Sequence, residues 1–246
     1  MENKPSLSIM IPAYNEEENI EQSIDNVLNA FKKVGFQKYE ILVFNDGSAD
    51  ATGEIAEKAA LKDPNIRVIH NKKNMNMGYN YRKAIELARC EYLGWAPGDN
   101  ETPPGALEIV FEGVGKADSV ISFTANQNIR PLARRVISRI YTASLNFLFG
   151  LDLRYFNGFN IHPVKMLRKL DLRTNSFACH AEAVICILKY NPNHSYVSPP
   201  TFIKPRAGEA KAFRIKNIIT TVKAILSLFW RVQIRKNMNP ARNSFE

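Results

Sequence analysis

The 246-residue sequence lacks the features that mark several large classes of protein. It has only three cysteines and no Cys-x-x-Cys pair, which argues against a disulfide framework or a zinc site and predicts reduced thiols in a cytosolic protein. No stretch reaches about 18 consecutive apolar residues, so no transmembrane helix is expected. The first residues hold no apolar core of signal-peptide type. A Gly-x-x-x-x-Gly-Lys-Ser/Thr sequence is absent, which excludes a P-loop nucleotide site.

The composition is that of a folded, basic protein. Hydrophobic residues make up 45% of the chain, which is enough for a buried core. The net charge of +9 favours binding to phosphates, anionic lipid headgroups or nucleic acid, although a solvated basic surface would explain it as well. We expect no nucleic-acid partner, because no helix-turn-helix, zinc-finger or RNA-recognition signature accompanies the charge.

Strand-like and helix-like segments alternate through the first half of the chain. Strands are predicted at 7–11, 40–44, 66–69, 92–96 and 119–123, and helices at about 50–61 and 79–89. A further helix is predicted between the first two strands, because Ile20, Ile24, Val27, Leu28 and Phe31 fall on one face at helical spacing. Asn15 is a plausible N-cap of the first helix, and Gly35 is expected to end it. The alternation predicts an α/β fold with a mostly parallel, Rossmann-like doubly wound sheet.

Two polar turns follow the first two predicted strands. Residues 12–17 follow the first strand and residues 45–50 follow the second. Ligands of open α/β sheets bind at the carboxyl ends of parallel strands, so these turns predict a site for a polar ligand.

These segments also carry a resemblance to a known family. The sequences PAYNEEENI (12–20), ILVFNDGSADAT (41–52) and GWAPGDNETPP (94–104) resemble, in order, the motifs of the family 2 glycosyltransferases, which have the GT-A fold. Three later segments, NGFNIHPVKML, HAEAVICIL and KPRAGEAKAF, are similar to the distal half of the polyprenyl-phosphate sugar transferases in that family. The resemblance runs from about residue 6 to about residue 213.

The resemblance implies a nucleotide-sugar donor and assigns residues to it. Pro12, Ala13, Tyr14 and Glu16 would face the nucleotide, and Asp46 would contact the base. Each motif alone would also fit an ordinary turn.

The third motif implies a metal site that departs from the family pattern. Family members usually carry an Asp-x-Asp pair here, but Pro97 takes the first aspartate position and Asp99 the second. Asp99 is therefore the expected catalytic, donor-binding and metal residue, and Glu101 is the expected second ligand of Mg²⁺ or Mn²⁺. The alternative is an acidic loop without a metal.

The later motifs point to the acceptor. Glu182, at the start of an apolar helix, would be the catalytic base if the acceptor is a sugar hydroxyl, or else a carboxylate favoured by the helix dipole. Arg206 and Lys211 suit phosphate oxygens, although a basic surface loop would look the same. Asn76 replaces the first glycine of the family's Asn-x-Gly-x-Gly turn, and asparagine tolerates left-handed backbone.

Two helices with an apolar stripe and several cations are predicted at 130–149 and 212–236. Helices of this kind can lie in a membrane interface, or they can pack on a sheet with snorkelling cations. We therefore divide the chain into a GT-A domain (1–213) and a C-terminal amphipathic helix and tail (214–246).

The sequence thus predicts an inverting glycosyltransferase that acts at the cytoplasmic face of a membrane. Its partners would be a nucleotide-sugar donor, a lipid-phosphate or glycan acceptor, and an anionic membrane surface contacted peripherally. Polyprenyl phosphate is the expected acceptor. A sugar hydroxyl in surface polysaccharide synthesis, or a catalytically weak nucleotide-sugar binder, are the alternatives.

Overall fold

The computed structural model describes residues 4–205 and 215–234. Its first half alternates between strands and helices, as the sequence predicts: β1 (Leu7–Ala13), α1 (Ile20–Val34), β2 (Tyr39–Asn45), α2 (Thr52–Lys62), β3 (Ile66–His70), α3 (Met77–Leu87) and β4 (Tyr92–Trp95). The elements that follow are α4 (Ala106–Phe111), β5 (Ser119–Val120), β6 (Phe123–Thr124), a 3₁₀ turn (Gln127–Ile129), α5 (Leu132–Phe149), β7 (His162–Pro163), α6 (Val164–Leu167), α7 (Cys179–Tyr190), β8 (Tyr196–Val197), β9 (Pro200–Thr201) and α8 (Ile215–Phe229), which continues as a π-helical turn (Trp230–Ile234).

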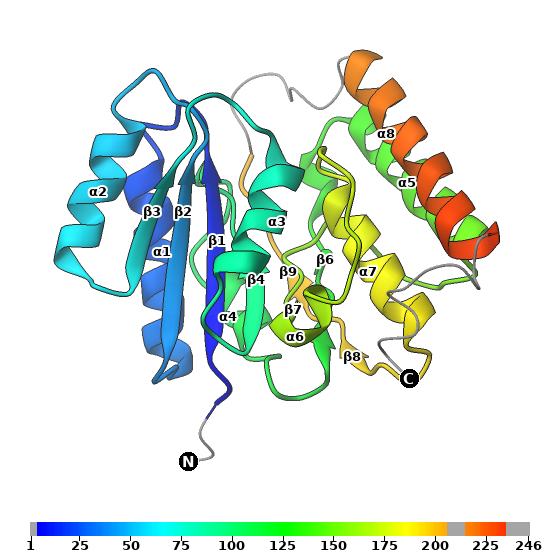
Figure 1. Ribbon diagram of the computed structural model, residues 1–246, viewed down its shortest axis with the longest axis horizontal. Coiled ribbons are helices and arrows are strands. Elements are labelled where there is room, and N and C mark those ends of the chain that lie inside the picture. The colour runs from blue at the N-terminus through cyan, green and yellow to red at the C-terminus, as the bar shows by residue number, and fades with distance from the viewer. Residues whose placement is uncertain (1–3, 206–214, 235–246) are drawn as a thin grey trace.

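The central sheet has five strands in the order β3-β2-β1-β4-β7. The first four are parallel and β7 is antiparallel, which confirms the predicted mostly parallel sheet. The chain steps from β1 to β2 and β3 on one side and then crosses to β4 on the other, so the direction of winding changes at β1. In such sheets a crevice opens at the carboxyl ends of the strands beside this switch point. That edge lies at the top of Figure 1.

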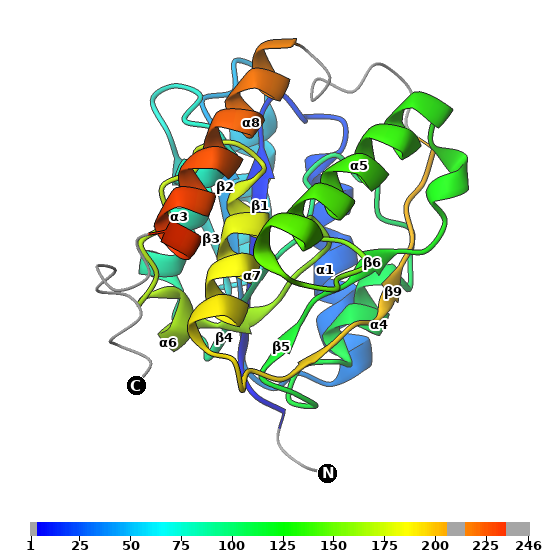
Figure 2. The same cartoon turned by 90° about the vertical axis from the view of Figure 1, so that its right-hand side faces the viewer.

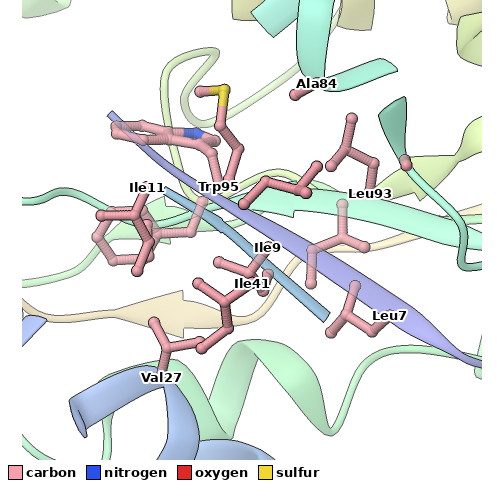
Figure 3. Close-up of a cluster of buried hydrophobic side chains, with 14 of the residues drawn as sticks. Leu7, Ile9, Ile11, Val27, Ile41, Ala84, Leu93 and Trp95 are labelled. Carbon is pink, nitrogen blue, oxygen red and sulfur yellow. The ribbon is translucent and has the colours of Figure 1, made fainter. Parts of the chain in front are cut away.

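Apolar side chains fill both faces of the sheet. Leu7, Ile9 and Ile11 alternate along β1 and are fully buried. Figure 3 shows Val27 of α1 on one side of these strands and Ala84 of α3 on the other. Strands of parallel sheets read as near-continuous hydrophobic runs because helices cover both faces.

The first helix confirms one predicted boundary and corrects the other. Gly35 ends α1 with φ +84°, a left-handed conformation that glycine adopts without strain, and its N–H donates to the Phe31 carbonyl. Asn15 is not the N-cap, because α1 begins only at Ile20 after a turn that starts at Glu16. The Asn15 side chain instead accepts a hydrogen bond from the N–H of Ala49 at 2.9 Å.

The predicted strand at 119–123 forms two short strands outside the central sheet. β5 pairs with β8 and β6 pairs with β9, both in parallel. Between them the N–H groups of Ile121 and Phe123 still donate to the carbonyls of Val197 and Pro199. Pro199 has no N–H to return, and the Ile121 carbonyl accepts instead from the Ser198 hydroxyl at 2.9 Å. A side chain therefore takes the place of a backbone partner between the two strands.

A second apolar cluster joins α5, α7 and α8. It includes Leu145, Phe149, Leu228 and Val232, all nearly fully buried, and the rings of Phe149 and Phe229 lie 6.1 Å apart. α8 is therefore packed on the rest of the chain along this face. The proposed division at residue 213 stays a prediction, since residues 206–214 lie outside the described part. Within the described residues, no helix is both long and apolar enough to span a membrane. Cys90, Cys179 and Cys186 are buried and carry free thiols.

At the opposite edge of the sheet from the crevice, two buried histidines share one hydroxyl. The Ser119 hydroxyl lies 2.8 Å from His162 Nδ1 and 2.8 Å from His194 Nε2. Burial lowers the pKa of both imidazoles, that of His162 to about 3. Both rings are therefore neutral in the folded protein at neutral pH.

We predict that the protein loses stability in mild acid. The unfolded chain binds a proton at each histidine with a pKa near 6.5, whereas folded His162 does not, so falling pH favours unfolding below about pH 6.5. The difference between the two pKa values lowers the free energy of unfolding by about 2 kcal/mol at pH 5 from His162 alone. Urea unfolding at pH 7 and pH 5 measures this loss. His162→Gln should reduce it, while His70→Gln, at a half-exposed histidine, should not. Equal stability of the wild type at both pH values would contradict the prediction.

Candidate functional site

The carboxyl ends of β1, β2 and β4 border a cavity of about 500 Å³. Seven residues that the sequence assigns to the donor and its metal line this cavity together: Pro12, Ala13, Tyr14, Glu16, Asp46, Asp99 and Glu101. The three motifs are separated by up to about ninety positions in the sequence, and the sheet order brings them to one place.

Hydrogen bonds join the loop after β1 to the loop after β2. The Glu16 N–H donates to the Thr52 hydroxyl at 2.8 Å, and the Asp46 N–H donates to the Ala13 carbonyl at 2.8 Å. The Asn15–Ala49 bond described above adds a third link. The predicted nucleotide-binding residues therefore stand on two loops that support each other.

The Asp46 carboxylate organises a third loop. It accepts hydrogen bonds from the Asn71 side chain at 2.7 Å and from the backbone N–H groups of Met75 and Asn76 at 2.8 and 3.1 Å. Asn76 has a positive φ of +69° with ψ +163°, which lies outside the left-handed helical region. A carboxylate has about four acceptor positions. Contact with a nucleobase stays a prediction for Asp46, whose protein partners leave capacity for one further donor.

The loop after β4 runs close against the end of β1. A Cβ atom at Gly98 would lie 2.6 Å from the Pro12 carbonyl oxygen, so only glycine fits this approach. Asp99 and Glu101 follow directly and are half-buried in the cavity wall, where Asp99 Oδ1 accepts from the Glu101 N–H at 3.2 Å.

Two carboxylates on one short loop suit a hard divalent cation. Among the described residues no group of three or more His, Cys, Asp or Glu side chains is arranged to hold a metal. The assignment of Asp99 and Glu101 as metal ligands stays a prediction, in which water and phosphate oxygens of a ligand would supply the other positions, as is common for Mg²⁺. Pro97 lines the cavity where the family's first aspartate is expected.

Cations line another part of the cavity wall. Arg130 precedes α5 and Arg134 lies in its first turn, and both contribute to the lining. In the sequence both belong to the predicted basic helix at 130–149, and no motif there points to a role in the site. Arg206 and Lys211 lie outside the described residues. The segment leading to them approaches the acidic loop, because the Lys204 N–H donates to the Glu101 carbonyl at 2.7 Å and its Nζ to Asn100 Oδ1 at 3.1 Å.

Glu182 is placed differently from the other predicted residues. Its side chain is almost fully buried and does not contribute to the described cavity lining. The carboxylate accepts from the N–H groups of Arg173 and Thr174 and forms an ion pair with Arg231. These contacts favour a structural role, and the role of catalytic base stays a prediction.

Sequence reasoning missed three neutral polar residues in the cavity wall. Asn80, His180 and Thr201 come from α3, α7 and β9 and are nearly fully buried. His180 begins the HAEAVICIL segment that carries part of the resemblance, but the sequence assigns no site role to any of the three residues, and only the fold brings them together. The His180 ring stacks on Trp95 and lies at a tilt of 59° to Tyr81, with each pair of ring centres 4.7 Å apart.

The model of the glycosyl transferase family 2 matches residues 8–174, which include the three loops of the cavity. The chain belongs to this family. Among its curated relatives, glycosyltransferase AglD of Haloferax volcanii is 26% identical over 93% of this chain and 38% of the relative. Chondroitin synthase of Pasteurella multocida is 30% identical over 52% of this chain and 13% of its own length. The chain spans 38% or less of the length of both relatives.

Solved structures share the fold of this family member. Glucosyl-3-phosphoglycerate synthase from Mycobacterium tuberculosis, in complex with Mn²⁺, UDP-glucose and phosphoglyceric acid, superposes with a TM-score of 0.68 at 14% identity, covering 92% of this chain and 80% of that one. The same enzyme has also been crystallised with Mg²⁺ and UDP, at a TM-score of 0.67. The likeness confirms the predicted GT-A fold.

We predict that Glu182 matters chiefly for stability. Glu182→Gln removes the negative charge that pairs with the partly buried Arg231, and breaking a buried pair from one side costs about 3 kcal/mol. Urea unfolding of this variant measures the loss. Adding Arg231→Met should restore part of the stability, because the uncompensated cation is removed as well. A Glu182→Gln variant with unchanged stability and abolished sugar transfer would contradict the structural role and support the catalytic one.

Proposed function

We propose that this chain is an inverting glycosyltransferase that moves a sugar from a nucleoside-diphosphate sugar to a membrane-associated acceptor, polyprenyl phosphate being the preferred class. The observation that carries the proposal is the gathering of all seven predicted donor residues around one cavity at the switch point of the sheet. Membership of glycosyl transferase family 2 supports it.

The donor half of the reaction uses the three loops at the sheet edge. Asp46 and residues 12–16 hold the nucleoside, and Asp99 and Glu101 face the diphosphate. These two carboxylates would hold Mg²⁺ or Mn²⁺, which when bound supplies positive charge beside the leaving diphosphate. The acceptor oxygen attacks the anomeric carbon as the bond to the diphosphate breaks, and this single displacement inverts the anomeric configuration.

The acceptor half favours an anionic nucleophile. Arg130 and Arg134 place two guanidinium groups in the cavity wall, and guanidinium pairs well with phosphate oxygens. A phosphate oxygen is already ionised at neutral pH and needs no general base. This agrees with the position of Glu182, which is held by Arg231 and two backbone N–H groups.

A sugar hydroxyl is the second candidate acceptor. The likeness to a chondroitin synthase over 52% of this chain favours it. This acceptor requires a base at the cavity, and Glu182 would then have to leave its present partners. Replacement of the first metal-binding aspartate by Pro97 keeps a third possibility open, a catalytically weak nucleotide-sugar binder.

An outward apolar surface supports peripheral contact with a membrane at its cytoplasmic face. We call it the α5–α8 surface and define it by its exposed apolar residues: Leu132, Val136, Ile137, Ile140 and Phe147 of α5, Val222 and Leu226 of α8, and Trp230 and Ile234 of the turn after it. Both helices lie on one side of the molecule and converge toward their C-terminal ends (Figure 2). The sequence of α5 carries three arginines and no acidic residue, which suits an anionic lipid surface.

The donor assignment predicts metal-dependent stabilisation by one nucleotide class. A ligand that binds only the native protein raises its unfolding temperature as its concentration exceeds Kd. Thermal unfolding is followed with UDP-, GDP- and dTDP-sugars, each with Mg²⁺, Mn²⁺ or EDTA. We expect one class to stabilise the wild type by several degrees when metal is present.

Variants test which residues carry this stabilisation. Asp99→Asn should abolish the metal dependence, and Asp46→Ala should abolish the response to every nucleotide. Asp25→Asn, on the polar face of α1, is the control and should respond like the wild type. If no donor stabilises the wild type with any metal, the donor assignment is wrong.

The membrane assignment predicts binding to anionic vesicles. Co-sedimentation with phosphatidylglycerol vesicles should exceed that with phosphatidylcholine vesicles and should weaken with added salt. Ile140→Asp combined with Leu226→Asp should reduce binding roughly tenfold, because two charges would enter the interface. Leu61→Asp, at an exposed leucine of α2 on the far side of the molecule, should leave it unchanged. Equal sedimentation of all three proteins would exclude the α5–α8 surface.

A further inference from the structure

The polar groups that line the cavity differ in burial. Glu16, Asp99, Glu101, Arg130 and Arg134 line the cavity and are only partly buried. Asn80, His180 and Thr201 line the same cavity, and their exposed fractions are 1%, 2% and 1%. Asp46 is the one buried charge, and three hydrogen-bond donors of the protein compensate it.

Each of the three neutral residues has a polar atom without a partner. Among the described residues, nothing hydrogen-bonds to Asn80 Nδ2, His180 Nε2 or Thr201 Oγ1. Buried polar atoms are nearly always hydrogen-bonded, because water is no longer available to them. Three such atoms in the wall of one cavity, from three separate elements, indicate that a ligand completes their hydrogen bonds.

The surroundings of His180 define the chemistry of that ligand. Its ring is parallel to Trp95 within 13°, and the rings of Phe159 and Trp95 meet edge to face, so the buried wall is aromatic and apolar around its polar atoms. Burial lowers the pKa of His180 to about 3, so the imidazole is neutral at physiological pH and offers one donor and one acceptor. A flat aromatic wall with neutral donors and acceptors matches an uncharged ring that carries several hydroxyl groups.

We propose that Asn80, His180 and Thr201 form the subsite for the transferred sugar, and that they select an uncharged pyranose over a sugar acid. The inference rests on the proposed donor function and assigns residues within it. The charged, partly buried groups would then serve the diphosphate and the acceptor phosphate, and the neutral, buried groups would serve the sugar between them.

Two variants remove polar atoms with little change of shape. His180→Phe keeps a flat ring against Trp95 and Tyr81 and removes both ring nitrogens, Nδ1 and Nε2. Thr201→Val replaces only the hydroxyl by a methyl group. Thr102→Val is the matched control, since Thr102 is also buried with an unpartnered hydroxyl but does not contribute to the described cavity lining. The hydroxyls of Thr201 and Thr102 have no partner to lose, so the free Thr201→Val and Thr102→Val variants should be as stable as the wild type or more so.

Calorimetric titration compares each bare nucleotide with its sugar conjugate. The probes are UDP, GDP and dTDP alone, then UDP-glucose, GDP-mannose, dTDP-glucose and UDP-glucuronic acid, all with Mn²⁺. We expect His180→Phe and Thr201→Val to weaken binding of the preferred nucleotide sugar roughly tenfold, with the Kd of the bare nucleotide unchanged. The wild type should bind UDP-glucuronic acid more weakly than an uncharged sugar of the same nucleotide. Thr102→Val should match the wild type throughout.

The outcomes separate this inference from the proposed function. If a bare nucleotide binds and the two variants bind every nucleotide sugar as tightly as the wild type, the subsite is wrong and the donor site stands. Equal losses for the bare nucleotide and its sugar conjugate would also overturn the subsite. A wild type that binds no nucleotide refutes both. A lowered unfolding temperature of free His180→Phe would show that the histidine contributes to packing. The binding data of Thr201→Val, which changes the packing less, would then decide whether the subsite exists.

Discussion

The end of β1 is the point on which the site depends. The Ala13 carbonyl accepts the N–H of Asp46, which fixes the loop after β2, and the Pro12 carbonyl lies against Gly98, which fixes the loop after β4. Both contacts follow from the sheet order, since β1 is the only strand with β2 on one side and β4 on the other among the described elements. The loops that carry Asp46, Asp99 and Glu101 are thus positioned by backbone atoms at the end of β1.

The same region carries the backbone strain of the molecule. In the described residues, three residues other than glycine have positive φ, namely Asn15, Asn76 and Asn100, and each lies in one of the loops around the cavity. Asparagine is the residue that tolerates this conformation best after glycine, because its short side chain can hydrogen-bond locally. Such strain persists where the surroundings enforce it, and it clusters at functional sites. The unpartnered polar atoms of Asn80, His180 and Thr201 are a second unfavourable contribution to the free energy of folding. The ligand-free protein is therefore less stable than it would be with an apolar, unstrained cavity wall.

The sequence was sufficient for the parts of the structure that rest on local pattern. The sheet was predicted from the periodicity of the first three helices and from the apolar strands, and seven cavity residues were predicted from the ordered motifs. Each of these signals lies within a short contiguous segment of the sequence. The start of α1 was predicted wrongly, because Asn15 has a partner 34 positions away, which no local rule reveals. The split of 119–123 depends on pairing with a strand some 77 positions later, and the cavity positions of Arg130, His180 and Thr201 depend on tertiary packing. Arg206 and Lys211 lie beyond the described residues, so their assignment to phosphate rests on the sequence alone.

Replacement of the first metal-binding aspartate by Pro97 changes the electrostatics of the acidic loop more than its shape. The loop keeps its close approach to β1 through Gly98, and its remaining carboxylates line the cavity. It loses one negative charge, and Lys204 stands beside it with its Nζ 3.1 Å from Asn100 Oδ1. A divalent cation is attracted less strongly to a loop with fewer carboxylates and a nearby ammonium group, whereas a diphosphate is attracted more strongly. Under the proposed function, protein cations therefore stabilise more of the negative charge on the leaving group than they would in a site with an Asp-x-Asp pair. This role would account for part of the strongly basic composition of the chain.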